Sequence, residues 1–282
     1  MSTPPATTEL REVRGPSSLG GGRRRFFSLL WLMSATEFKR TYFGTVLGYL
    51  WSLVRPLMLF AVLLFVFTKI FRVGSNVPNY PVLLLLGIVL YSFFQEASNS
   101  AVTSVVAQEG VVRKTQFPRL VIPLSVVLTA TFNLLVNLLV VFVFILARGV
   151  DPTWTWLLFP IPLALLFVFA AAISMMLSAL YVRFRDVAII WSVLATVLFY
   201  GTPILYPIEK VPDQYKNVIL LNPLAPIFEQ VRVWILDPGA PTAVGAAGSV
   251  LALLPAIAIF IAVCGLGVWV FAHEAPRIAE EL

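Results

Sequence analysis

Charged side chains are scarce in this chain of 282 residues, because Asp, Glu, Lys and Arg together account for 12% of the sequence. A typical soluble domain contains about 25% of these residues. Cysteine and histidine each occur once, as Cys264 and His273. One cysteine cannot form an internal disulfide, and these two residues do not supply the ligands of a thiolate zinc site. The composition excludes an ordinary soluble domain and argues against metal chemistry.

The sequence also lacks the short motifs that mark common enzymes. It contains no Gly-x-x-x-x-Gly-Lys-Ser/Thr phosphate loop, no Gly-x-Ser-x-Gly nucleophile turn and no His-Glu-x-x-His helix. We therefore expect a chain that is not an enzyme and binds no cofactor itself, so that a separate partner would bind any ATP and Mg²⁺. The net charge of +6 fits basic residues at a membrane surface, and nucleic-acid binding is not needed to explain it.

Hydrophobic residues make up 59% of the chain and gather in long runs. A helix needs about 20 apolar residues to cross a bilayer. Most of the runs approach or exceed that length. The pattern predicts an all-α integral membrane protein in which residues 46–272 form a six-span domain. The expected spans are residues 56–71, 82–107, 120–147, 152–182, 187–208 and 238–272.

Basic residues indicate the orientation of this domain, because they collect in cytoplasmic loops. They are dense in residues 23–40, and three more, Arg113, Lys114 and Arg119, follow the second expected span. We therefore expect both termini to lie in the cytoplasm. The loop at residues 108–119 has no catalytic group, so its three positive charges favour a docking role toward a partner at the inner membrane face.

The two ends of the chain are expected to lie outside the spans. Residues 1–22 are rich in Pro, Ser, Thr and Gly and predict a disordered tail, and residues 273–282 form a second cytoplasmic tail. Residues 23–45 predict an amphipathic helix on the membrane surface. An alternative is the first half of a long tilted span, although three charges within four residues would be costly in hydrocarbon. The apolar stripe of the helix consists of Phe27, Trp31, Ala35, Phe38 and Tyr42.

Prolines interrupt the segment 203–238 so often that a continuous spanning helix is excluded. Two short apolar stretches remain, and Asn222-Pro223 forces a turn between them. We expect either two short helices that re-enter the membrane from the exterior or a pair that lies on its surface. In the first case Asn222 and Pro223 would form part of an exterior gate.

One acidic residue, Glu96, lies well inside an expected span, with Gln95 and Asn99 beside it. An ionisable group at this depth is a functional candidate. It would act as a proton relay in a secondary carrier, or it would simply be satisfied by neighbouring helices. Asn133 and Asn137 share one face of the next span, where they can hydrogen-bond to another helix.

Several motifs occur in order along residues 23–282, and together they resemble the membrane subunit of type-2 ABC exporters of polysaccharides. The resemblance is to the permeases for O-antigen and teichoic acid, and the composition also fits export of a cell-wall galactan. The motifs are Leu47-Gly48-Tyr49-Leu50-Trp51-Ser52-Leu53-Val54-Arg55-Pro56-Leu57, Phe117-Pro118-Arg119 followed by Pro123-Leu124, Arg183-Phe184-Arg185-Asp186-Val187, and Glu274-Ala275-Pro276-Arg277-Ile278.

This resemblance implies a homodimer in a bacterial plasma membrane that works with two copies of an ABC ATPase and exports a lipid-linked glycan. Alternatives are a drug or lipid export permease, or a proton-coupled carrier that uses Glu96. By position, the implied ATPase-docking residues are Phe27, Trp31, Lys39, Arg40, Arg113, Lys114, Phe117, Pro118 and Arg119. The implied candidates for lining the pore are Phe60, Tyr91, Phe94 and Tyr200.

Overall fold

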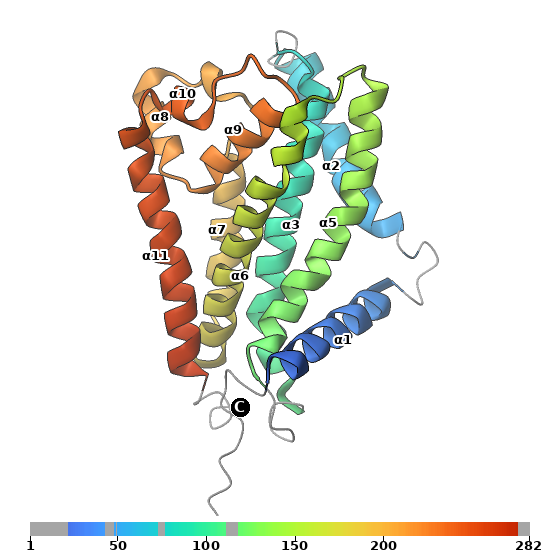
Figure 1. Ribbon diagram of the computed structural model, residues 1–282, viewed down its shortest axis with the longest axis vertical. Coiled ribbons are helices and arrows are strands. Elements are labelled where there is room, and N and C mark those ends of the chain that lie inside the picture. The colour runs from blue at the N-terminus through green and yellow to red at the C-terminus, as the bar shows by residue number, and fades with distance from the viewer. Residues whose placement is uncertain (1–21, 43–47, 49, 73–76, 111–117, 276–282) are drawn as a thin grey trace, which may run out of the picture.

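The computed structural model describes residues 22–42, 48, 50–72, 77–110 and 118–275. Every regular element in these ranges is a helix, and the longer helices form one elongated bundle (Figure 1). The α-helices are α1 Arg23–Tyr42, α2 Leu50–Phe65, α3 Tyr80–Ala107, α5 Val121–Ala147, α6 Pro160–Arg183, α7 Val187–Tyr200, α8 Asp213–Leu220, α9 Leu224–Ile235, α10 Ala243–Ala247 and α11 Val250–Glu274. Three short turns of helix complete them, η1 Val66–Ile70, η3 Trp154–Leu158 and η4 Ile208–Lys210.

The apolar helices confirm an all-α integral membrane protein. In the described part of the chain, five segments are long and apolar enough to cross a bilayer, and a sixth is added if the bent pair α8 and α9 counts as one. The five are Leu50–Ile70, Tyr80–Ala107, Val121–Ala147, Trp154–Arg183 and Val250–Glu274.

Three of the expected spans differ from the helices. The first begins at Leu50, because Pro56 is accommodated inside α2. The fifth ends as a helix at Tyr200, because the following residues form a turn that contains Pro203. The last was expected from Pro238, but α11 begins at Val250. An apolar run therefore did not distinguish the short helix α10 from the span that follows it.

Helix α3 forms the centre of the bundle and packs against α2, α5, α6 and α7. It is the most buried of the candidate spans, whereas few residues of α2 and α11 are buried. Tyr91 and Phe94 of α3 are almost fully buried, and Tyr91 donates a hydrogen bond to the carbonyl of Ala195 in α7. Phe94 stacks on Phe169 of α6 at a centroid distance of 5.8 Å.

Tyr91 and Phe94 were expected to line a pore, and both rings are buried within this chain. Their surroundings are other side chains of the packed core, so neither ring reaches an open surface. Phe60 is also largely buried, against Phe144 of α5. Only Tyr200 of the four candidates has an exposed ring.

Helix α1 lies obliquely across the lower end of α5 (Figure 1). The buried hydroxyl of Ser34 donates to the Ser125 carbonyl at 3.1 Å, and Thr129 donates back to the Ser34 carbonyl at 3.3 Å. Trp31 and Phe38 contact the ring of Phe132 edge-on, at centroid distances of 5.5 and 5.6 Å. The helix is thus attached to the bundle by two hydrogen-bonded small side chains between aromatic contacts.

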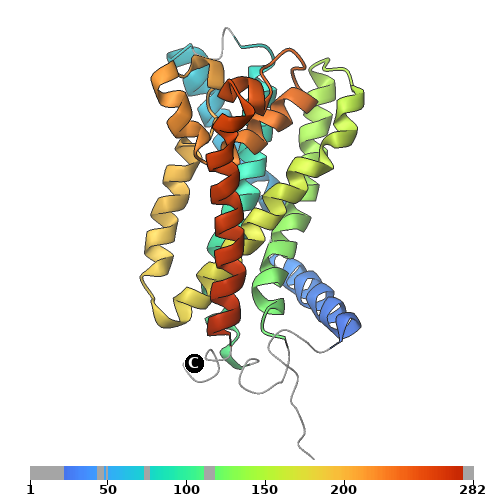
Figure 2. The same ribbon diagram turned by 60° about the vertical axis from the view of Figure 1, so that its left-hand side comes forward.

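The upper end of the bundle carries the short helices. Figure 2 shows α7 following α6 back from the lower end toward the hairpin of α8 and α9. The axes of α8 and α9 differ by 104° at the break between them. Asn222 and Pro223 lie in this break, as the proline pattern predicted.

The contact between α6 and α11 depends on a glycine. A Cβ atom on Gly267 would lie within 3.0 Å of three backbone atoms of Ala172, whereas one on Gly265 would meet no atom within 4 Å. We predict that Gly267→Ala lowers the free energy of unfolding by about 1–3 kcal/mol, since the helices would have to separate. Gly265→Ala is the matched control and should not lower it. Thermal unfolding of the purified protein in detergent measures both, and equal midpoints would contradict the close contact.

Candidate functional site

A large cleft opens between α2, α3 and α5, with a volume of about 1060 Å³. Most of its polar lining comes from one face of α3. Gln95 and Glu96 each lie three or four residues from Ser92 and from Asn99, which places these side chains on one face. Glu96 and Asn99 are exposed to the space. The cleft therefore presents hydrogen-bonding groups from the middle of a candidate span.

Helix α5 supplies the opposite wall and holds the carboxylate of Glu96. The Asn133 side-chain amide donates to Glu96 Oε1, and the Asn137 amide donates to the Asn133 carbonyl at 2.8 Å. Asn133 Oδ1 is buried and has no hydrogen-bond partner among the described residues. Polar residues that the sequence singled out in two separate spans thus lie together, and one buried hydrogen-bond acceptor among them is unpartnered in the described part of the chain.

Helix α2 closes the cleft with Trp51 and Arg55, two residues that sequence reasoning did not connect with Glu96. The guanidinium of Arg55 lies near enough to Glu96 for the two charges to attract. Trp51 precedes Arg55 by one helical turn and keeps 52% of its surface exposed. Their proximity to Glu96 follows from the packing of α2 on α3, and no spacing in the sequence signals it.

A second polar cluster fixes the hairpin at the upper end. Arg232 of α9 is buried and forms ion pairs with Glu209 at 2.8 Å and Glu229 at 3.5 Å. The backbone N–H of Ile208 donates to Glu229 at 3.3 Å. Burial raises the pKa of Glu209, but the hydrogen bond and charge of Arg232, a backbone hydrogen bond and the charge of Lys216 together outweigh burial and keep that pKa below its ordinary value. The cluster attaches α9 to the turn before α8.

The predicted gate residues Asn222 and Pro223 join this hairpin to the end of α7. Asn222 donates to the Thr202 hydroxyl at 2.8 Å, and its side-chain oxygen accepts from the Leu224 N–H at 3.0 Å. Pro223 directly precedes α9. These contacts brace the sharp turn, because they satisfy polar groups that neither short helix can satisfy alone.

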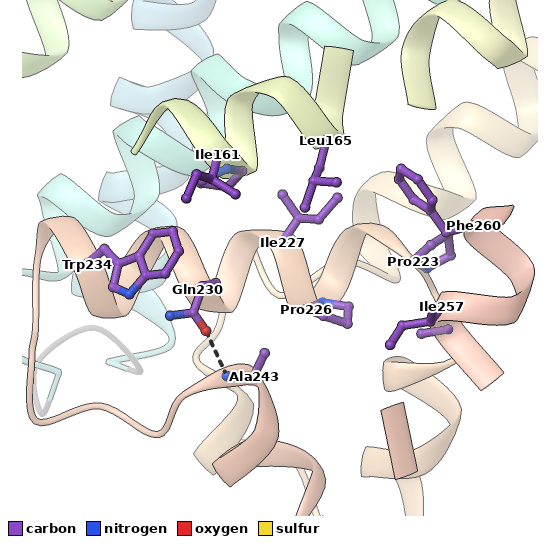
Figure 3. Close-up of a pocket in the computed structure, with 12 residues that line it drawn as sticks. Ile161, Leu165, Pro223, Pro226, Ile227, Gln230, Trp234, Ala243, Ile257 and Phe260 are labelled. Atoms are coloured by element: carbon purple, nitrogen blue, oxygen red, sulfur yellow. Dashed lines mark hydrogen bonds between the residues drawn. The ribbon is translucent and has the colours of Figure 1, made fainter. Parts of the chain in front are cut away.

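An apolar pocket of about 270 Å³ lies behind the same hairpin (Figure 3). Ile161 and Leu165 of α6, Trp234 of α9 and Phe260 of α11 face it (Figure 3). Gln230 is its one polar side chain and accepts a hydrogen bond from the Ala243 N–H at 3.4 Å. The pocket lacks the convergent polar groups that would orient a ligand, and we do not assign it to the site.

The expected docking residues are divided between two surfaces. Phe27, Trp31, Lys39 and Arg40 are exposed on α1. Pro118 is buried, and the Arg119 guanidinium donates to the carbonyl of Ala275 at the end of α11. Arg119 therefore has a contact within the chain that the sequence did not suggest. Arg113, Lys114 and Phe117 lie outside the described residues.

The chain has clear similarity to known membrane transport proteins. The family described as "ABC-2 type transporter" matches residues 28–236. The O-antigen export system permease protein RfbA of Klebsiella pneumoniae is 34% identical over 201 residues, or 71% of this chain and 76% of that protein.

Two further relatives show similarity over more of the chain. RfbA of Myxococcus xanthus is 30% identical over 242 residues, or 84% of this chain and 92% of that protein. The polysialic acid transport protein KpsM of Escherichia coli is 26% identical over 239 residues, or 84% of this chain and 90% of that protein. The family match runs from α1 to the end of α9, so it includes both the cleft and the hairpin of α8 and α9.

The charge cluster of the hairpin makes a direct prediction about stability. Arg232→Ala should destabilise the fold by about 3–5 kcal/mol, because it leaves Glu229 buried without its cation. Lys216→Ala removes an ion pair with Asp213, whose side chain is 95% exposed, and should leave the unfolding midpoint unchanged. Thermal unfolding in detergent compares the two variants. If Arg232→Ala were as stable as Lys216→Ala, the cluster would not hold the hairpin.

Proposed function

Since the chain belongs to the ABC-2 type transporter family, we propose that it exports a lipid-linked polysaccharide from the cytoplasm to the outer face of the plasma membrane. It would act as the permease subunit of an ATP-driven exporter. Relatives named for O-antigen export and polysialic acid transport support a polysaccharide cargo. They favour it over the drug or lipid cargo of other ABC exporters.

The observation that carries this proposal is the polar cleft between α2, α3 and α5. A sugar chain is rich in hydroxyl groups and cannot cross hydrocarbon without hydrogen-bond partners. The cleft supplies a carboxylate, amides and a guanidinium from helices that are long and apolar enough to span the bilayer. Polar groups at this depth are tolerated where they face a water-filled path.

A second copy of the chain would complete the path. One wall of the cleft is α2, which also exposes apolar side chains outside the cleft, including Leu59, Val62 and Phe65. Two copies related by a twofold axis would bury these apolar faces and enclose the two clefts together. A homodimer would therefore bury the apolar surface of α2 and enclose the polar surface of the cleft.

The arrangement of the helices supports six crossings, formed by α2, α3, α5, α6, α7 and α11. Helix α1 and the end of α11 lie at the same end of the bundle in both views (Figures 1 and 2), so the number of crossings between them is even. Helix α7 has 14 residues and rises about 21 Å, and the turn after it completes the crossing. The hairpin of α8 and α9 is then re-entrant on the exterior side, with Asn222 and Pro223 in its gate.

The ATPase partner would bind at the lower end. ABC-2 permeases of type-2 exporters work with an ATPase, and two copies would match a permease homodimer. We assign the docking role to the exposed basic and aromatic side chains of α1 and to the loop 108–119. Both chain termini would then be cytoplasmic, and the ATPase would bind the ATP and Mg²⁺. A proton-coupled carrier is less well supported, because Glu96 is tied to Asn133 by a hydrogen bond.

Deletion of the gene in its native bacterial host tests this function. The surface glycan should disappear and its lipid-linked precursor should accumulate inside the cell, because synthesis continues without export. Wild-type protein expressed in trans should restore display, as judged by surface labelling and by extraction of the lipid-linked pool. Undiminished display after deletion would refute the proposal.

The same strain tests the docking assignment. The double variant Arg113→Ala/Lys114→Ala should fail to restore display and should lose the copurifying ATPase. Arg148→Ala is the matched control, because Arg148 is a basic residue at the other end of α5, and it should restore both. Equal recovery of the ATPase with all variants would exclude loop 108–119 as the docking surface.

A further inference from the structure

The charges in the cleft limit what it can bind. In the described lining, Arg55 is the only cation and Glu96 the only anion, and the two attract each other. Their fields largely cancel at a distance, so the cleft does not concentrate ions of either sign. A phosphate would gain from Arg55 but would be repelled by Glu96. The cleft is better suited to a neutral, polar ligand.

Hydrogen-bonding groups in the cleft include both donors and acceptors. Glu96 accepts, Arg55 donates, and the exposed amide of Asn99 can do both. Asn133 is only 3% exposed, and its amide holds the Glu96 carboxylate from the buried side by donating to Oε1. Sugar hydroxyls both donate and accept, and they match this mixture.

A flat apolar surface lies beside these groups. Trp51 is half exposed in the cleft and lies one turn from Arg55 on α2. A pyranose ring has apolar C–H faces and a polar rim, so a site for it requires an aromatic plane next to hydrogen-bonding groups. Indole has a large, rigid surface of this kind. Trp51, Glu96 and Asn99 all line the cleft, and together they meet both requirements.

We infer that the cleft contains a subsite for one neutral sugar unit of the transported glycan, with Glu96, Asn99 and Arg55 bound to its hydroxyls and Trp51 against its ring. This inference rests on the proposed function, because the cargo supplies the sugar. Passage of a polymer requires each contact to be weak, and a single subsite of a few hydrogen bonds satisfies that condition. No individual sugar should therefore bind tightly.

Ligand-observed NMR on the full-length protein in lipid nanodiscs tests the subsite. The probes are the methyl glycosides of galactose, glucose, mannose, rhamnose and N-acetylglucosamine, with inorganic phosphate as the charged comparison. At least one glycoside should show saturation transfer that other sugars displace and phosphate does not. Glu96→Gln and Trp51→Leu should each weaken binding about tenfold.

Two variants separate binding from folding. Trp51→Phe keeps an aromatic ring and should bind better than Trp51→Leu. Trp269→Leu removes another exposed tryptophan, on α11 and outside the cleft, and should bind like the wild type. A loss of binding that is equal in Trp269→Leu and Trp51→Leu would overturn the inference.

Other outcomes distinguish this inference from the proposed function. The sugar subsite would be overturned if Glu96→Gln and Trp51→Leu bound the glycosides as well as the wild type does. Displacement of a bound glycoside by phosphate would overturn it too. If the purified protein binds no glycoside but deletion of its gene still abolishes the surface glycan, the subsite is overturned and the export function stands. Binding as predicted, together with normal display after deletion, would support the subsite and refute the export function.

Discussion

The fold depends on one constraint, which is that hydrocarbon offers no partner for a polar group. Side chains at membrane depth must be satisfied by neighbouring helices, by water or by cargo. The structure meets this demand in two ways. In the hairpin of α8 and α9, Arg232 offsets the buried charge of Glu229 at 3.5 Å, although Glu229 Oε2 has no hydrogen-bond partner among the described residues. In the cleft, Glu96 accepts a hydrogen bond from Asn133 and is otherwise exposed to the open space. The first arrangement builds a rigid element, and the second leaves capacity for a ligand.

Helix α3 connects these two regions because its faces have different roles. One face carries Glu96 and the polar residues of the cleft. The other face holds α7 and the segment before the hairpin, through the Tyr80 hydroxyl on the Leu205 carbonyl at 2.8 Å and through Gly87 against Ile204. A change in the packing of α3 would therefore affect the cleft and the hairpin of α8 and α9 together. This gives a physical route by which a change at the lower end of the bundle could reach its upper end.

The lengths of the apolar runs predict much of the fold, but they predict little of the site. The runs that became α3, α5 and α6 were long enough to specify spanning helices, and Asn222-Pro223 specified the break in the hairpin. The start of α11 could not be read, because α10 and the residues around it are as free of charge as the span that follows. The burial of Tyr91 and Phe94 was missed, since an aromatic ring suits lipid, pore and core alike. Glu96 and Asn133 were recognised as polar residues in spans, but their pairing with each other, and with Arg55, depends on how the helices are rotated.

The most direct test of a hydrated polar cleft is cysteine accessibility in native membranes. In a Cys264→Ser background, Ser100→Cys would place a thiol in the cleft, and Leu139→Cys would place one on an exposed apolar face of α5. A water-soluble maleimide should label Ser100→Cys at least about tenfold faster than Leu139→Cys, because only the thiolate in water reacts. Equal, slow labelling of both variants would show that the cleft is dry and would contradict its role as the path of the glycan.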